Sequence, residues 1–398
     1  MTRVRINAQE ANRKPASTLR RVREVTQRRA KPLGFQPPAI GAEEIEAVAE
    51  TLRSGWLTTG PRAAELERRM AEYLEAEHVV ALASGTAAMH LALLALDVGP
   101  GDEVVTTPIT WPATANVIVH AGATPVFADV RASDLNIDPA RVAELVTERT
   151  KAILPVHLAG QPCDLDPLWA LGIPVVEDAA HAIESRYRGR KLGGLSDATC
   201  FSLYATKNVA AGEGGLLATN RADVAERVLD LRLMRRGGHT HYDVLVPGYK
   251  ANLSDVLAAI ALVQLGKVER HTAIRRRQFD LYDEGVADLE GIEPLAREDR
   301  DTHAYHLYVV RIDAERAGGT RDEYQQALAE EGIASSIHFL PVHRLSWYRE
   351  RFPEQQPLPV AERAGQEVLS LPLSPAHSED DIGDAVSALR RVHARFAG

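Results

Sequence analysis

The stretch Thr199-Cys-Phe-Ser-Leu-Tyr-Ala-Thr-Lys-Asn-Val-Ala-Ala-Gly-Glu-Gly-Gly215 places one lysine, Lys207, between a β-like run and a glycine-rich turn. Residues 199–204 are rich in β-branched and aromatic types, whereas the glycines after them permit turns and close backbone approaches. A strand end followed by a tight loop is where α/β proteins place their chemistry. A lysine buried there, beside the hydroxyl of Ser202, can lose its proton and form a Schiff base with an aldehyde. The alternative is an ordinary solvated loop lysine.

Upstream of this stretch, apolar runs alternate with helix-compatible segments. Strands are expected at 78–83, 103–107, 125–129, 151–156 and 173–177, and helices at 87–96, 113–120 and 139–147. This alternation predicts an α/β fold whose central, mostly parallel sheet is flanked by helices on both faces. Ligands of such sheets bind beyond the carboxyl ends of the strands.

The chain of 398 residues is too long for one hydrophobic core, and its pattern changes after a long apolar helix expected at 256–277. Beyond that helix, strands are expected at 305–312 and 334–340, and helices at 321–331 and 376–396. We therefore expect a large domain over 34–265 and a smaller C-terminal α/β domain over 266–398. Residues 34–58 could pack on the smaller domain.

Residues 1–33 form an arm of different composition. Residues 1–31 hold ten Arg or Lys against two Glu. The formal net charge of the whole chain is −9, so the rest of the chain carries −17. The arm lacks apolar periodicity and interleaved aromatic residues, so we expect a flexible, solvated segment that catalysis does not need and that binds no nucleic acid. Electrostatic steering of an anionic substrate is the alternative role.

Membrane insertion, secretion and structural metal are not expected. No apolar run approaches the ~18 to 20 residues of a membrane span, and the N-terminus lacks the apolar core of a signal peptide. The two cysteines, Cys163 and Cys200, show no paired metal-ligand spacing. These features predict a cytoplasmic protein without membrane partners.

Two segments near the start of the large domain are less specific. Ile45, Val48 and Leu52 recur at helical spacing and predict a short amphipathic helix. The next segment, Ser54-Gly-Trp-Leu-Thr-Thr-Gly-Pro61, is too rich in glycine, proline and hydroxyls to be regular. It is a loop that offers ligand donors such as Thr59, although a plain connector explains it equally well.

Polar residues follow several of the predicted strands. Ser84-Gly85-Thr86 stands between a strand and a helix, where free backbone N–H groups and hydroxyls can hold a phosphate, although Ser and Thr are also ordinary helix caps. Asp178 ends an apolar strand, where a carboxylate needs a cation such as a protonated heterocycle, or else caps a helix. Trp111 could stack on a flat ring or fill the core, and His181 could contact a ring or be structural.

Together these features describe a pyridoxal phosphate site: a phosphate turn, a stacking aromatic residue, a strand-end aspartate and a glycine-flanked lysine, in that order. Over nearly all of residues 34–395, the chain resembles the DegT-type nucleotide-sugar aminotransferases, members of the aspartate aminotransferase superfamily of fold type I. The segments that carry this resemblance are 54–61, 83–92, 101–105, 177–182, 201–208, 212–215 and 248–255.

The resemblance implies a role for each residue of the site. Lys207 is the Schiff-base lysine and Asp178 contacts the pyridine nitrogen, so these two are the catalytic residues. The cofactor is pyridoxal 5'-phosphate, with pyridoxamine 5'-phosphate as the intermediate. The other implied contacts are Trp111 stacked on the ring, His181 near the ring or its oxygen, and Gly85, Thr86 and Ser202 at the phosphate.

The resemblance also implies a homodimer with active sites at the subunit interface. Lys250 or Asn252 would reach the partner's phosphate. The chain reads Gly248-Tyr-Lys-Ala-Asn252 where the commonest family pattern is Gly-Tyr-Asn-Tyr-Arg, so which of the two side chains makes this contact is open.

Within the family, the loop around Thr59 and the segments 109–111, 155–160, 337–343 and 347–353 look most like the branch that aminates 4-keto sugars, including the enzymes that make 4-amino-4-deoxy-L-arabinose nucleotides. The expected reaction moves nitrogen from L-glutamate to the keto carbon of a UDP- or dTDP-linked sugar. His338 and His343 could contact the sugar or diphosphate, or could pack in the core. The alternatives are a PLP- or PMP-dependent sugar dehydratase, against which Lys207 argues, and a non-catalytic PLP-binding regulator.

Overall fold

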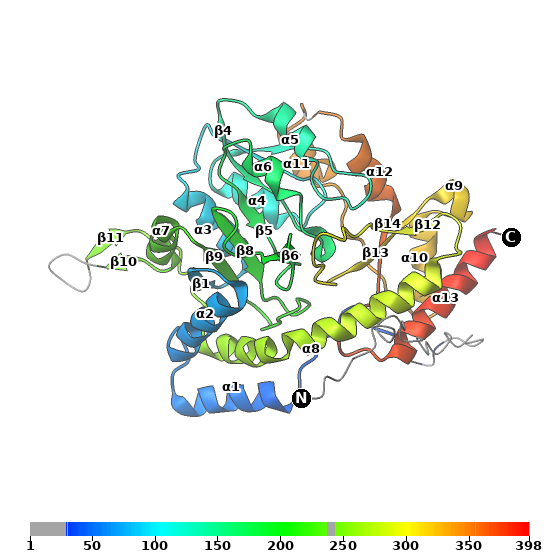
Figure 1. The fold of residues 1–398 in the computed structure, drawn as a ribbon, viewed down its shortest axis with the longest axis horizontal. Coiled ribbons are helices and arrows are strands. Elements are labelled where there is room, and N and C mark those ends of the chain that lie inside the picture. Colours follow the sequence, from blue (N-terminus) through cyan, green and yellow to red (C-terminus); the bar gives the residue numbers. More distant parts are fainter. Residues whose placement is uncertain (1–28, 30, 237–242, 355, 398) are drawn as a thin grey trace, which may run out of the picture.

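The computed structural model describes residues 29, 31–236, 243–354 and 356–397 (Figure 1). The predicted α/β fold is confirmed. The strands of the central sheet are β1 (His78–Leu82), β2 (Glu103–Thr106), β3 (Thr124–Phe127), β4 (Thr150–Leu154), β5 (Val176–Asp178), β8 (Ala198–Ser202) and β9 (Gly215–Thr219). Isolated parallel bridges from Ile153 to Val175 and from Val156 to Asp178 join β4 to β5, which gives the order β3-β2-β4-β5-β8-β9-β1. Only β9 runs antiparallel to its neighbours in this sheet.

Both faces of this sheet are buried. Adjacent residues of one strand, such as Val104 and Val105, belong to different hydrophobic clusters, as expected when helices cover both sides. One face packs against α3 (Gly85–Ala95), α4 (Ala113–His120) and α7 (Ala222–Arg232). The other face packs against α2 (Pro61–Leu74), α5 (Pro139–Leu145), α6 (Leu165–Trp169) and the first half of α8 (Asp255–Val286).

The C-terminal part of the chain has its own core. The strands β12 (Ile292–Pro294), β13 (Tyr308–Ile312) and β14 (Val368–Leu371) form an antiparallel sheet in that order. Helices α10 (Arg321–Glu330) and α13 (Glu379–Ala397) pack on it together with the second half of α8, which runs along the molecule and joins both cores (Figure 1). Further elements are α9 (Ala314–Ala317), α11 (Ser346–Arg351), α12 (Pro359–Glu367), β6 (Arg186–Tyr187), β7 (Arg190–Lys191), β10 (Arg235–Arg236), β11 (Val244–Val246) and two 3-10 turns, η1 (Leu158–Gly160) and η2 (Val342–Arg344).

The strand expected at 334–340 is absent. Its apolar residues Ile337 and Phe339 pack between the central sheet and the C-terminal part, and only Ser336 forms a bridge, to Ser370. The edge of β13 that such a strand could have extended is taken by β14, which the sequence pattern had not revealed.

Helix α1 (Ala42–Ser54) is present where it was expected, but its apolar side faces outward. Ile45 and Leu52 are exposed, whereas Glu44 is buried against α8. Glu44 accepts hydrogen bonds from Lys267 Nζ (2.6 Å) and Gln264 Nε2 (2.7 Å). Burial by itself raises the pKa of Glu44, but these partners and the Gly41 amide outweigh it and hold the pKa at about 2. A buried carboxylate with this many donors anchors the polar face of α1 and leaves the apolar face free.

Most of the basic arm lies outside the described residues, so its dispensability stays a prediction. The charge of Arg29, however, is not solvated as expected. Its guanidinium contacts Asp381 (2.8 Å) and Asp384 (2.6 Å) on α13. Along the parts of the chain that the structure describes, every helix is too short or too polar to cross a membrane.

Candidate active site

A cavity of about 470 Å³ opens at the carboxyl edge of the central sheet, next to the ends of β1, β5 and β8. The predicted site residues that line it are Gly85, Thr86, Trp111, Asp178, His181, Ser202, Lys207 and His338. These residues come from five separate segments of the chain, at strand ends, in loops and at one helix start, so the fold assembles the site that the sequence could only list.

Asp178 lies at the end of β5 and is 5% exposed. Its Oδ2 accepts a hydrogen bond from Thr114 Oγ1 (2.8 Å), and its Oδ1 accepts one from the Ala180 amide (3.1 Å). Burial raises the pKa of Asp178, and the two hydrogen bonds and the nearby Lys207 only partly offset it. The helix-cap alternative is wrong, because no helix begins after Asp178. The carboxylate is therefore buried beside the cavity, and no cation of the described residues is in contact with it.

Lys207 follows β8 and lines the same cavity. Its backbone amide donates to the Tyr204 carbonyl (2.8 Å), which closes a turn and directs the side chain inward. Burial lowers the pKa of Lys207 to about 8, although the charge of Asp178 opposes this shift. The side chain is therefore not the solvated loop lysine of the alternative reading, and a large share of its amine is neutral near pH 8.

Two glycines allow the chain to wrap closely around one end of the cavity. A Cβ on Gly85 would lie 3.1 Å from Ser202 Cβ, and a Cβ on Gly215 would lie 2.2 Å from the backbone of Ser84. The Ser84 hydroxyl caps α3, because it accepts a hydrogen bond from the Ala87 amide (3.0 Å). This cap uses the Ala87 amide and leaves the earlier N–H groups of α3, beside Gly85, available to a ligand. A helix start of this kind binds anions.

Rings form much of the remaining wall. Trp111 is 65% exposed, so it is not a core residue, and its ring lies 6.4 Å from that of Phe339. His181 lies 4.4 Å from His306, centroid to centroid, and its buried Nδ1 has no hydrogen-bond partner in the described part of the chain. Burial lowers the pKa of His181 well below its ordinary value, so the neutral ring presents a polar atom that a ligand could satisfy.

His338 lines the cavity, whereas His343 does not. His338 Nδ1 lies 2.9 Å from Ser370 Oγ, and burial lowers the pKa of its ring to about 4. His343 is buried beside Phe127, with its Nε2 3.3 Å from Glu362 Oε1. These surroundings fit the core-packing alternative for His343.

Thr59, Lys250 and Asn252 also lie outside the cavity lining of their own chain. They contact one another instead. Lys250 Nζ donates to Asn252 Oδ1 (2.6 Å), and Asn252 Nδ2 donates to Thr59 Oγ1 (2.5 Å). Lys250 is exposed, so its ammonium group could reach another molecule.

Several cavity residues were missed by the sequence analysis. Thr114 supports Asp178, and Tyr204, Glu213 and His306 line the wall. Tyr204 and Glu213 belong to the stretch that contains Lys207, so their position could have suggested them. Thr114 and His306 carry no local signal, because each reaches the site only through the packing of distant segments.

Pyridoxal phosphate fits these residues. Among the residues that the structure describes, Asp178 contacts only neutral hydrogen-bond donors, and a protonated pyridine nitrogen would supply a cation. The start of α3 with Gly85 and Thr86 could hold the phosphate, while Trp111 and His181 could face the ring and Lys207 could carry the aldehyde.

Comparisons with known proteins agree with this chemistry. Residues 38–390 match the profile of the DegT/DnrJ/EryC1/StrS aminotransferase family. The chain is 43% identical, over 92% of its length and 99% of the relative's, to the spore coat polysaccharide biosynthesis protein SpsC of Bacillus subtilis (strain 168).

Two solved structures extend the comparison. The PLP form of Spr1654 from Streptococcus pneumoniae matches with a TM-score of 0.85 at 34% identity, over 92% of this chain and 99% of that one. DesI, solved in the presence of its TDP-sugar product, matches with a TM-score of 0.86 at 34% identity, over 93% and 95% of the two chains.

Proposed function

Because this chain belongs to the DegT/DnrJ/EryC1/StrS aminotransferase family and is a PLP-dependent sugar aminotransferase, we propose that it aminates C4 of a nucleotide-activated keto sugar, with L-glutamate as the amino donor. The observation that carries the catalytic part is the cavity shared by Lys207 and the cation-free carboxylate of Asp178. The nucleotide-sugar part is supported by DesI, which was solved with a TDP-sugar product.

The residues of the cavity divide the work of the reaction. The cofactor, when bound, withdraws electrons from the carbon that gains or loses a proton. Lys207 Nζ, with its pKa lowered to about 8, can accept a proton and return it near neutral pH. Asp178 would keep the heterocyclic nitrogen of the bound cofactor protonated, and Thr114 holds this carboxylate in place. Trp111, His181 and the start of α3 orient the bound group and exclude water from it.

A panel of substrates tests the specificity. We expect UDP- or dTDP-4-keto sugars to yield the 4-amino product with L-glutamate, as measured by mass spectrometry of the sugar and by release of 2-oxoglutarate. The 3-keto isomers should react about 10²-fold less efficiently in kcat/KM, because the carbonyl would lie away from Lys207. Preference for a 3-keto sugar would refute the C4 assignment, and a dehydrated sugar product would favour the dehydratase alternative.

The site of one chain is short of positive charge for these substrates. In the described part of the chain, no arginine lines the cavity, and its charged side chains are Asp178, Lys207 and Glu213. The cofactor phosphate, the carboxylates of L-glutamate and the sugar diphosphate are all anionic, so they require cations from elsewhere. This shortage supports a homodimer in which Lys250 supplies a cation to the partner's site, whereas Asn252 would supply only a neutral hydrogen bond.

Exposed apolar residues beside these two support the same proposal. Trp56 and Leu57 precede Thr59, which contacts Asn252, and Tyr249 precedes Lys250; all three apolar side chains are more than half exposed. Exposed aromatic residues next to a polar site are typical of an interface.

A mixing experiment tests the shared site. Lys250→Ala and Lys207→Ala chains should each be nearly inactive alone. Hybrid dimers should regain one intact site, which amounts to about a quarter of the parent activity after random reassortment in equal amounts. The same mixture with Asn252→Ala identifies which residue crosses over. Lys151→Ala in place of Lys250→Ala is the control. No recovery in either mixture, with dimers shown by light scattering, would place both residues in their own chain's site. A Lys250→Ala or Asn252→Ala chain that is fully active alone would place that residue outside catalysis.

A further inference from the structure

The buried amide of Asn208, next to Lys207, joins separate segments of the chain. Its Nδ2 donates to both carboxylate oxygens of Glu184 (2.8 Å each) and to the Ala304 carbonyl (2.8 Å). Its Oδ1 accepts from Arg275 Nη1 (2.8 Å) and from His306 Nδ1 (2.9 Å). Buried partners therefore occupy every hydrogen-bonding position of this amide.

These partners also fix the orientation of the amide and the proton on His306. The Nδ2 atom faces only acceptors, and the Oδ1 atom faces the guanidinium of Arg275, so the two cannot be exchanged. Because Oδ1 only accepts, His306 Nδ1 must carry a hydrogen. His306 lines the cavity and packs on His181, so the network reaches from α8 to the wall of the site.

Glu184 and Arg275 are both buried, yet in the described part of the chain they contact Asn208 and form no ion pair with each other. Asn208 stands between them, with its N–H toward the carboxylate and its C=O toward the guanidinium. Both contacts are charge-assisted and polarise the amide in the same direction, so they hold it more firmly than neutral partners would. Burial raises the pKa of Glu184 and lowers that of Arg275 to about 10, and each charge opposes the shift of the other.

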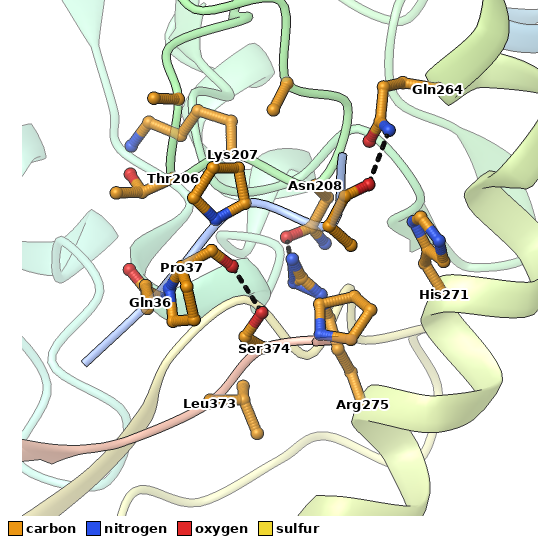
Figure 2. A pocket seen from close by; sticks show the side chains of 15 residues that line it. Gln36, Pro37, Thr206, Lys207, Asn208, Gln264, His271, Arg275, Leu373 and Ser374 are labelled. Atoms are coloured by element: carbon orange, nitrogen blue, oxygen red, sulfur yellow. Dashed lines mark hydrogen bonds between the residues drawn. The ribbon is translucent and has the colours of Figure 1, made fainter. Parts of the chain in front are cut away.

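Buried charges are costly, and stability alone is a weak reason to keep them. The gain lies in precision. Figure 2 shows Arg275 reaching from α8 to Asn208, while the Lys207 side chain extends away on the other side. A displacement of about 1 Å at a reacting group can cost roughly 10²-fold in rate, so a clamp on the adjacent residue matters to Lys207.

We propose that Glu184 and Arg275 are positioning residues for Lys207, and that they act through the amide of Asn208. This inference rests on the proposed role of Lys207. Neither residue needs to touch the substrate or the cofactor, so the clamp should affect kcat and leave substrate binding nearly unchanged.

An exchange of the carboxylate and the amide tests the clamp. Asn208→Asp places a second carboxylate against Glu184 and the Ala304 carbonyl, while it keeps an acceptor for Arg275 and His306. We expect kcat to fall about 10²-fold, with KM for both substrates within about threefold of the parent. Adding Glu184→Gln to this variant places an amide at 184 opposite the carboxylate at 208, so the pair again has one donor and one carboxylate. The value of kcat should therefore recover at least about tenfold.

Arg275→Met should lower kcat by a similar factor. Arg276→Met is the matched control, because Arg276 is the next residue of α8 and is exposed, so it should keep the parent kcat. Thermal melting of each variant shows whether a loss of activity reflects unfolding.

A second measurement avoids turnover. In the cofactor-free protein, pulse acetylation followed by peptide mass spectrometry should label Lys207 at least about threefold faster, relative to the exposed Lys151, in Asn208→Asp than in the parent. Glu184→Gln in the same chain should reverse this change.

The outcomes separate the clamp from the role of Lys207 itself. Folded Asn208→Asp and Arg275→Met proteins with parent kcat and labelling would overturn the clamp while leaving Lys207 as the cofactor lysine. The clamp would also be overturned if the loss of kcat in Asn208→Asp with Glu184→Gln equalled the product of the losses in the two single variants, because the two residues would then act independently. Reductive trapping of the cofactor on another lysine would instead refute the role of Lys207, whatever the clamp variants do.

Discussion

Replacing Lys207 by alanine should lower kcat for transamination by roughly 10⁴-fold or more, because one substitution removes both the covalent anchor and the group that moves the proton. The variant should still bind the cofactor weakly, since the phosphate and pyridine contacts belong to other residues. Single-turnover measurement of keto acid release gives the rate. In the parent enzyme, borohydride reduction followed by peptide mapping should fix the cofactor to Lys207.

Lys151 provides the matched control, because it is exposed on β4 and does not line the cavity. Lys151→Ala should keep the parent kcat and the parent pattern of reduction. The chain holds only seven lysines, so the map is easily complete. Covalent label on Lys191, Lys250 or Lys267 in the parent would show that Lys207 is not the anchor.

Lys207 and Asp178 could be found from the sequence because their signals are local. Each follows an apolar strand directly, and parallel strands bring their carboxyl ends to one edge of a sheet. The glycines at 85 and 215 could also be read from the sequence as sites of turns and close backbone approach. The structure agrees at Gly215, where an added Cβ would lie 2.2 Å from the backbone of Ser84. The alternation of strands and helices predicted a mostly parallel sheet, whereas the strand order and the antiparallel β9 came only from the structure.

The partners of these residues could not be found in the same way. Asn208 is held by Glu184, Arg275 and His306, which come from three distant parts of the chain. Helix α1 shows the same limit, because the burial of Glu44 depends on Lys267 and Gln264 of α8 rather than on its own pattern. Hydrophobic periodicity shows that a helix is amphipathic, but a buried polar contact can decide which side faces the core.

Asp178→Asn should lower kcat by about 10² to 10³-fold, because it keeps a hydrogen bond but removes the buried charge that stabilises the proton on the pyridine nitrogen. Stopped-flow measurement of the half-reaction with L-glutamate reports this loss. The charge of Asp178 also raises the pKa of Lys207 against the effect of burial. The pKa of Lys207 should therefore fall further below about 8 in the cofactor-free variant, as followed by pH-dependent acetylation. Thr114→Val, which removes only the supporting hydroxyl, should cost about tenfold or less.

The stability of the cofactor-free protein distinguishes this role from a structural one. Burial raises the pKa of Asp178, so the folded state favours the protonated acid. Its stabilising contribution is present below the unfolded value of about 3.9 and is lost as the pH rises through the raised value. At pH 7 the cofactor-free parent therefore holds an unfavourable carboxylate, and Asp178→Asn should melt at the same or a higher temperature. This advantage should shrink as the pH falls through the raised value toward about 4, and the variant should gain less stability than the parent from added pyridoxal phosphate. A cofactor-free variant that melts well below the parent at pH 7 would show that Asp178 serves the fold rather than the cofactor.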